Sequence, residues 1–336
     1  MDRQAPEAGI ALIVADAVER FDRMRESTSH VVQGLRARGV QAWLAEPAGI
    51  ALMPGGVIAR ARRVVSLTSP PFVYALDDAR RVPVTDFALV FIRHDPPVDD
   101  RFRAPLELLA LVADRVRCIN DPRTMLQWSE KTLPLRWPAL TPATWIVSNA
   151  GEALDAIRAC GTAIVKPLHR CGGSGVFLVR GDDSNAAPIV EECFRSEARL
   201  IVQQYLPGAR YGDARILTLG DTVLGGFLRV PVAGSHRSNL HCQARLEPWR
   251  VTSAVARRLE PVLRTLAAEG VVFAGVDWID GHLTEVNITS PMGLAELDAT
   301  GFAGARGQNA ADVLVQHCLG LAGIAAPQTS NPAHIT

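Results

Sequence analysis

The sequence carries no excess of charge of either sign, and this limits the partners it can attract. Its 336 residues include 35 basic and 35 acidic side chains, so the formal net charge is zero. Such a chain has no general attraction for nucleic acid or for an anionic membrane surface. We therefore expect small charged ligands, with no nucleic-acid or membrane partner.

Long apolar runs and paired cysteines are also missing. No stretch approaches the roughly 20 apolar residues of a membrane span, and residues 1–7 lack the apolar core of a secretory signal. We therefore expect a cytoplasmic protein whose six cysteines stay free thiols, since no Cys-x-x-Cys pair occurs. Zinc is rejected, because neither His169 with Cys171 nor His241 with Cys242 has a second ligand pair at the spacing usual for zinc sites.

The chain is long enough for two or three domains, and 48% of its residues are hydrophobic. Residues 9–14, 40–44 and 87–92 are predicted strands, and residues 27–38 a helix that ends at Gly39. This order predicts a parallel sheet. No dinucleotide fingerprint follows the first strand, which argues against a dehydrogenase. A proline-rich stretch at 133–142 places a domain junction near residues 120–127.

Residues 275–287 are the most informative segment, because they place three oxygen ligands on one predicted β-hairpin. Alternation puts Glu285 and Asn287 on the same face of the second strand. A two-residue Asp-Gly loop would pair Asp277 with Thr284, whereas a three-residue loop, 280–282, pairs it with Glu285; we predict the second. Two carboxylates and a carbonyl oxygen suit Mg²⁺. The alternative is an ordinary exposed hairpin.

A glycine-rich loop follows a predicted strand that carries Lys166. Gly172 and Gly173 allow successive backbone N–H groups to converge on a phosphate, and Lys166 adds a positive charge. The loop is not a Walker motif, which needs a lysine and a hydroxyl directly after its last glycine. The alternative is a plain hairpin turn.

A second polar edge lies at residues 200–219, where one predicted strand leaves into a loop and another begins with Asp213. An adenine could lie at this edge. Asp213 could accept ribose hydroxyls, and Arg215 could point at phosphate oxygens. As isolated residues, both are also typical surface charges.

Together these motifs resemble the ATP-grasp superfamily and, within it, the bacterial glutathione synthetases. They follow one another in the family's order over nearly the whole chain. They are Arg93-His94-Asp95-Pro96-Pro97, Ser129-Glu130-Lys131, Ile164-Val165-Lys166-Pro167-Leu168 with Gly172-Gly173, Gln203-Gln204-Tyr205-Leu206-Pro207, Gly212-Asp213-Ala214-Arg215, Arg229-Val230-Pro231, Arg237-Ser238-Asn239-Leu240 and Leu283-Thr284-Glu285-Val286-Asn287-Ile288-Thr289-Ser290-Pro291.

The resemblance implies an α/β protein with an ATP-grasp fold. An N-terminal Rossmann-like (pre-ATP-grasp) parallel-sheet domain at 1–125 would precede two α+β subdomains that clasp ATP, at 126–204 and 205–325, and a tail at 326–336. The implied cofactors are ATP and Mg²⁺, with Mn²⁺ as the other candidate ion. The implied partners are a small-molecule acid and amine, and the implied assembly is a homo-oligomer.

The resemblance also implies individual roles. The implied nucleotide contacts are Lys131, Lys166, Gly172 and Gly173 for phosphates, Gln204, Tyr205 and Leu206 for adenine, and Asp213 for ribose. The implied metal ligands are Asp277, Glu285 and Asn287. The implied reaction contacts are Arg215 at the transferred phosphoryl group and substrate carboxylate, with Arg229, Arg237 and Asn239 nearby, and Ser290 and Pro291 at the acceptor amine.

The implied activity is ATP-dependent joining of a carboxylate to an amine through an acylphosphate, with γ-glutamylcysteine and glycine as the expected substrates and residues 230–245 as a lid. Three departures from the family's usual residues bear on specificity: His169-Arg170-Cys171, His241-Cys242-Gln243-Ala244 and Met292. The alternatives are a paralogue that joins a different acid and amine, and a non-catalytic ATP-binding regulator.

Overall fold

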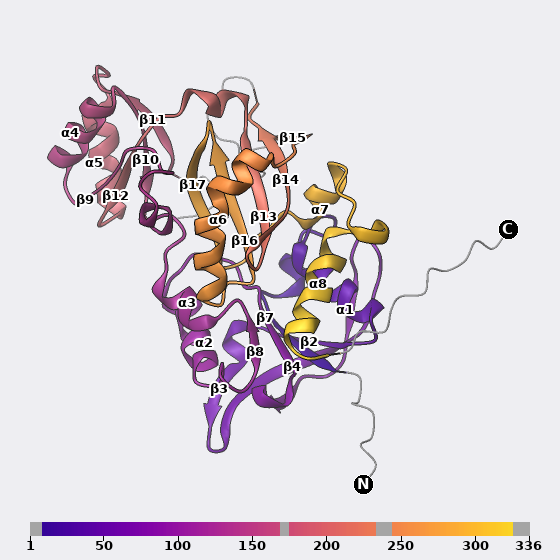
Figure 1. Ribbon diagram of the computed structural model, residues 1–336. Helices are drawn as coiled ribbons and strands as arrows, with labels where there is room; N and C mark the ends of the chain where they lie inside the picture. The colour runs from indigo at the N-terminus through magenta and orange to yellow at the C-terminus, as the bar shows by residue number, and fades with distance from the viewer. Residues whose placement is uncertain (1–8, 169–174, 233–243, 325–336) are drawn as a thin grey trace, which may run out of the picture.

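The computed structural model describes residues 9–168, 175–232 and 244–324, and Figure 1 shows three sheets with their helices. The first sheet has eight strands in the order β3-β4-β2-β1-β7-β8, with β5 and β6 also paired to β4. Its strands are β1 (Ile10–Val14), β2 (Gln41–Ala45), β3 (Ile50–Met53), β4 (Gly56–Leu67), β5 (Tyr74–Leu76), β6 (Arg80–Pro83), β7 (Leu89–Ile92) and β8 (Arg117–Ile119). Strands β2, β1, β7 and β8 are parallel, which confirms the predicted parallel sheet.

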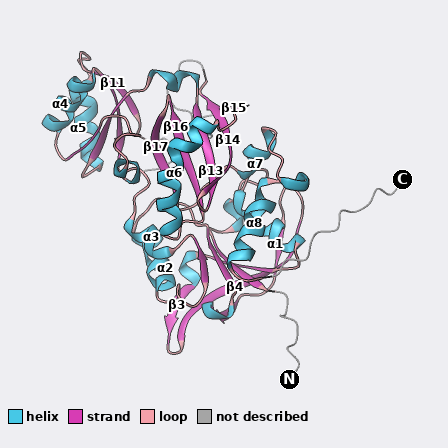
Figure 2. Ribbon diagram, viewed as in Figure 1, coloured by secondary structure: helices cyan, strands magenta, loops and turns pink. Residues whose placement is uncertain are grey.

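Helices cover both faces of this sheet, as Figure 2 shows. Helix α1 (Ser27–Ala37) packs with α8 (Ala310–Leu321) on one face, so the last helix of the chain returns to the first domain. Helix α2 (Asp100–Ala110), followed by α3 (Pro122–Gln127), packs on the other face. Alternate residues of β1 and β7 point into these two separate cores, because successive side chains of a strand point to opposite faces.

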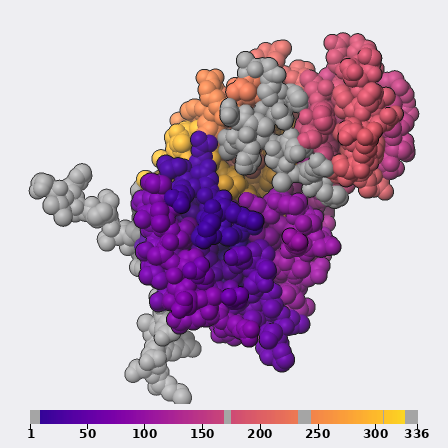
Figure 3. All heavy atoms as spheres, turned by 180° about the vertical axis from the view of Figure 1, so that it is seen from behind, coloured from indigo at the N-terminus to yellow at the C-terminus, as the bar shows by residue number. Residues whose placement is uncertain are grey.

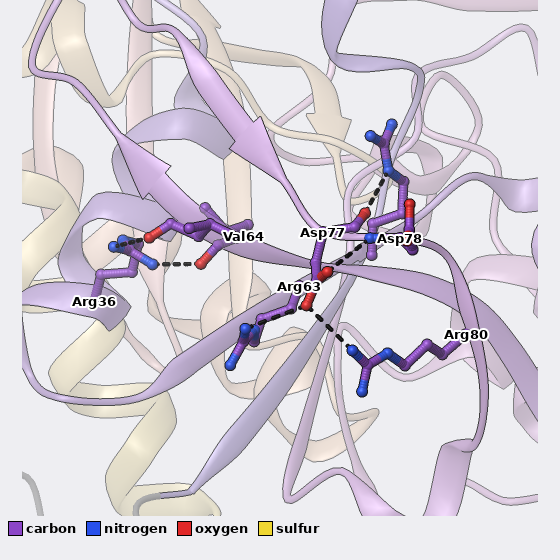
Figure 4. A network of polar contacts seen from close by, with 8 residues as sticks. Arg36, Arg63, Val64, Asp77, Asp78 and Arg80 are labelled. Carbon is purple, nitrogen blue, oxygen red and sulfur yellow. Dashed lines mark hydrogen bonds and ion pairs between the residues drawn. The ribbon is translucent and has the colours of Figure 1, made fainter.

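Arginine side chains connect the long strand β4 to Asp77 and to helix α1 (Figure 4). Arg63 and Arg80 both reach Asp77 Oδ2, at 3.2 and 3.4 Å. Arg36 of α1 donates to the carbonyl oxygens of Val64 and Val65. These contacts hold the outer strands against the helix layer.

The other two sheets form the second half of the molecule, and the space-filling view from behind shows the four-stranded unit beside the N-terminal domain (Figure 3). The four-stranded sheet, β11-β10-β12-β9, packs against two helices and consists of β9 (Thr144–Val147), β10 (Thr162–Pro167), β11 (Phe177–Arg180), β12 (Leu200–Gln204), α4 (Ala150–Cys160) and α5 (Ala186–Ser196). The five-stranded sheet, β15-β14-β13-β16-β17, packs against α6 (Ser253–Ala268) and consists of β13 (Asp213–Leu219), β14 (Thr222–Val230), β15 (Arg245–Pro248), β16 (Phe273–Ile279) and β17 (His282–Asn287). Helix α7 (Leu294–Ala299) follows β17.

Cys118, Cys193 and Cys318 lie in hydrophobic cores. Within the described ranges, no helix is long and apolar enough to cross a membrane.

Candidate active site

Three charged side chains stand in one row across the five-stranded sheet. Arg215 on β13 lies directly opposite Asp277 on β16, and Asp277 lies directly opposite Glu285 on β17. Residues directly opposite one another across neighbouring strands have side chains on the same face. The predicted pairing of Asp277 with Glu285 is therefore confirmed, and Arg215 joins the same face.

The three-residue loop that was predicted to produce this register was wrong. The turn has two residues, since Ile279 pairs with His282, and Asp280 and Gly281 both have positive φ, 49° and 82°. Such a turn matches the twist of the strands. A β-bulge then leaves Thr284 as an extra residue, and its hydroxyl donates to Asp277 O at 3.1 Å. The bulge sends Leu283 and Val286 into the core while Glu285 stays opposite Asp277.

A buried ion-pair network surrounds Asp277, the middle residue of this row. Arg215 Nε is 2.8 Å from Asp277 Oδ1, and one Arg229 Nη is 3.1 Å from the same oxygen. Arg229 also pairs with Asp213, which lies directly opposite it on β13. Burial favours the neutral form of Asp277, but the two guanidinium groups hold the pKa of that carboxyl below its usual range.

Glu285 has the opposite electrostatics. Burial and the neighbouring Asp277 raise its pKa to about 7, although Lys166 and Lys131 act in the other direction. Two carboxylates crowded on one face, with the amide of Asn287 following Glu285 on the same strand, leave negative charge that a divalent cation would neutralise. Asp277, Glu285 and Asn287 therefore fit a Mg²⁺ ion by the chemistry of their donors.

Gly275 makes room for Arg215. It lies two residues before Asp277 on the same face, and a Cβ atom built on it would come within 2.5 Å of an Arg215 Nη. The side-chain amide of Asn287, directly opposite Gly275, donates to Gly275 O at 3.2 Å. Residue 275 must therefore lack a side chain if Arg215 is to keep this position.

The two candidate phosphate lysines come from different parts of the chain and meet at the end of β10. Lys166 lies on β10, and its Nζ donates to Gln203 Oε1 at 3.2 Å. Lys131, in the segment after α3, donates to the carbonyl oxygen of the next β10 residue, Pro167, at 2.7 Å. Both charges act on Glu285, so the lysines lie within electrostatic range of the carboxylate row.

The remaining predicted residues lie in different parts of the structure, and some lie outside the described residues. Gln204 ends β12, and Tyr205 and Leu206 follow it at the connection to β13, where Leu206 is buried. Ser290 and Pro291 lie against the N-terminal domain: the Ser290 hydroxyl donates to Arg93 O at 3.1 Å. Gly172, Gly173, Arg237 and Asn239 lie outside the described residues, as do Cys171, Cys242 and most of the predicted lid.

Reasoning from the sequence missed the residues that hold this site together. Arg93 is buried and donates to Pro291 O at 3.0 Å, and Asn120 donates to Phe273 O and Ile288 O, both at 2.7 Å. Glu130 accepts three hydrogen bonds from Ile288 and Thr289. Arg93 and Glu130 belong to motifs that carried the family resemblance, but their contacts reach more than 150 residues along the chain.

Comparisons with known proteins agree with this arrangement. Residues 10–125 match the N-terminal domain of prokaryotic glutathione synthetase, and residues 130–301 match the ATP-grasp domain of the same family. The chain is 32% identical to glutathione synthetase of Prochlorococcus marinus, over 85% of this chain and 92% of the relative. It is 30% identical to that of Agrobacterium fabrum, over 87% and 92%.

Solved structures show the same fold at lower identity. A D-cycloserine synthetase superposes with a TM-score of 0.62 at 18% identity, over 94% of this chain and 99% of the other. A D-alanyl-alanine synthetase A from Vibrio cholerae superposes with a TM-score of 0.61 at 16% identity, over 95% and 100%. These likenesses support the ATP-grasp fold.

Proposed function

The chain belongs to the prokaryotic glutathione synthetase family, and from this premise we propose that it joins γ-glutamylcysteine to glycine at the expense of ATP. It is an ATP-dependent carbon–nitrogen ligase with an ATP-grasp fold. The observation that carries the proposal is the row Arg215–Asp277–Glu285, which lies within electrostatic range of the two lysines in the matched domain.

In the proposed reaction the acid's carboxylate oxygen attacks the γ-phosphorus of ATP and ADP leaves. The amine then attacks the acylphosphate carbon, phosphate leaves, and the nitrogen loses a proton. No protein nucleophile is required, because positioning and charge stabilisation carry phosphoryl transfer. We assign Arg215 to the transferred phosphoryl group and the substrate carboxylate, with Arg229, Arg237 and Asn239 beside it.

The other assignments follow from position and family. Lys131 and Lys166, with Gly172 and Gly173, are proposed to hold phosphates. Gln204, Tyr205 and Leu206 are proposed to contact adenine, and Asp213 ribose. Ser290 and Pro291 are proposed to border the acceptor amine.

Asp277, Glu285 and Asn287 are proposed to hold Mg²⁺. When bound, Mg²⁺ would neutralise phosphate charge during transfer. In the absence of metal, Arg215 and Arg229 hold Asp277 ionised by forming ion pairs with it. The choice of Mg²⁺ over Mn²⁺, the homo-oligomeric state and the cytoplasmic location stay predictions.

The test is a condensation assay read by mass spectrometry. The protein is incubated with ATP, Mg²⁺, γ-glutamylcysteine and glycine, and each component is omitted in turn. We expect glutathione, ADP and phosphate in equal amounts, and none when any component is missing.

Panels of amines and acids then separate the family's substrates from those of a paralogue. Ligation of γ-glutamylcysteine to another amine in preference to glycine would replace the acceptor assignment. Failure of γ-glutamylcysteine with every amine would overturn the proposed acid.

A further inference from the structure

Glu130 connects the proposed metal-binding strand to the segment that carries Lys131. Its Oε1 atom accepts hydrogen bonds from Ile288 N at 2.9 Å, Thr289 N at 3.0 Å and Thr289 Oγ1 at 2.7 Å. Its own backbone carbonyl accepts from Val286 N at 3.1 Å. One residue is thus bonded on both sides of Asn287, the last residue of β17.

The next residue extends the connection to another sheet. Lys131 Nζ donates to Pro167 O at the end of β10, one residue beyond Lys166. Two consecutive residues, Glu130 and Lys131, therefore contact β17 of the five-stranded sheet and β10 of the four-stranded sheet. The segment bridges the two subdomains between which the nucleotide is proposed to bind.

The hydrogen bonds of Glu130 are not needed merely to attach residues 288–291 to the rest of the protein. Asn120 already binds Ile288 O, and Arg93 already binds Pro291 O, so residues 288–291 are fixed to the N-terminal domain without it. Glu130 differs in that it lies next to Lys131. A carboxylate that accepts three hydrogen bonds from neighbouring donors also holds a more defined geometry than a single neutral contact.

We propose that Glu130 is a positioning residue that fixes the distance between the ligands Glu285 and Asn287 and the lysines Lys131 and Lys166. Metal and nucleotide phosphates would then bind as one unit. The inference rests on the metal and phosphate roles given under the proposed function. It does not depend on which acid and amine are joined.

The test uses Mn²⁺ and ADP as probes, so it needs no turnover. Mn²⁺ affinity is measured by electron paramagnetic resonance with and without ADP, in wild type, Glu130→Gln and Glu130→Ala. In the wild type, ADP should tighten Mn²⁺ binding. In Glu130→Ala we expect this enhancement to fall at least tenfold, and in Glu130→Gln to fall less, because the glutamine oxygen can accept the same bonds.

Asp298→Ala is the matched control. Asp298 also uses a carboxylate to hold a backbone amide, that of Ala310 at 2.8 Å, but at the start of α8 on the N-terminal domain. This variant should lose thermal stability and keep the full enhancement. Thr289→Val, which removes only the 2.7 Å contact, serves if Glu130→Ala does not fold, and should show a smaller loss of enhancement.

Unchanged enhancement in the folded Glu130 and Thr289 variants would overturn the proposal. Absence of Mn²⁺·ADP binding by the wild type would overturn both this inference and the metal assignment. Normal binding without ligation of γ-glutamylcysteine would overturn the proposed substrates alone.

Discussion

At the scale of single residues, Gly275 gives the sharpest test of how Arg215 is held. In Gly275→Ala the added methyl would lie within 2.5 Å of an Arg215 Nη, so the guanidinium must move. If Arg215 stabilises the transferred phosphoryl group, kcat should fall by roughly 10²-fold. The apparent affinity for ATP, measured in the same steady-state assay, should change much less.

Gly320→Ala is the control for this substitution, since among the described residues no atom outside the backbone of that helix and the two neighbouring residues lies within 4 Å of the Cβ position. It should leave kcat unchanged and stabilise the fold slightly. Equal kcat values for Gly275→Ala and wild type would exclude a steric role for Gly275.

Glu285 makes the stability of the metal-free protein depend on pH. Its pKa is raised from 4.5 to about 7 in the folded state, so the native protein binds the extra proton between these values. Unfolding free energy therefore falls as pH rises through this window, and the full cost is present above about pH 7. In EDTA, Glu285→Gln should be more stable than wild type at pH 8 by about 3 kcal/mol, with the difference vanishing near pH 4.5.

Urea unfolding at pH 8 and at pH 5 measures this difference. A stability gap between the two proteins that stays constant with pH would show that Glu285 titrates as an ordinary surface carboxyl.

The pairing of Asp277 with Glu285 was readable from the sequence, whereas the residues that support this pairing were not. Asp277 and Glu285 could be paired because both lie on one short hairpin, where sequence spacing limits geometry. Gly275 makes room for Arg215 on the neighbouring strand. Asn120 and Glu130 form hydrogen bonds with backbone groups more than 150 residues away along the chain. No local pattern marks such a role.

At the scale of elements, the β16–β17 turn depends on a glycine. Gly281 has φ of 82°, a conformation that a β-branched side chain adopts only with strain. Gly281→Val should lower the unfolding free energy by about 1–2 kcal/mol. Gly281→Asn should recover most of this loss, because asparagine tolerates the left-handed region.

Chemical denaturation of the three proteins gives the comparison. If Gly281→Val were as stable as Gly281→Asn, the turn in solution would differ from the two-residue form described above.

In the same hairpin, the strands could be predicted from the sequence but the bulge could not. An Asp-Gly pair predicts a two-residue turn, and the need to pair Asp277 with Glu285 instead suggested three residues. The bulge at Thr284 satisfies both conditions. It could not be foreseen, since bulges follow from how the strand packs on its core and not from a distinctive local sequence.

At the scale of the whole molecule, Asn120 joins the first sheet to the third. Its buried amide donates to Phe273 O and Ile288 O and accepts from Val272 N and Phe273 N, at 2.7–2.8 Å. Asn120→Ala would leave four backbone groups without these partners. We expect the unfolding free energy to fall by at least about 3 kcal/mol.

Asn149→Ala provides the reference, because Asn149 caps α4 through a single bond to Glu152 N at 2.9 Å. Its loss should cost about 1 kcal/mol. Equal costs for the two variants, measured by chemical denaturation, would show that Asn120 is no more than a local contact.

Sequence patterns were enough to predict the parallel strands of the first sheet, the hairpin that carries the carboxylates, and the family. Each depends on periodicity or on residues close together in the chain, which local spacing constrains. The tertiary structure decided how Lys131 reaches β10, how Glu130 and Asn120 reach β16 and β17, and why α8 packs on α1. Those contacts arise when distant segments bury polar and apolar groups against each other, and burial of that kind depends on the whole fold.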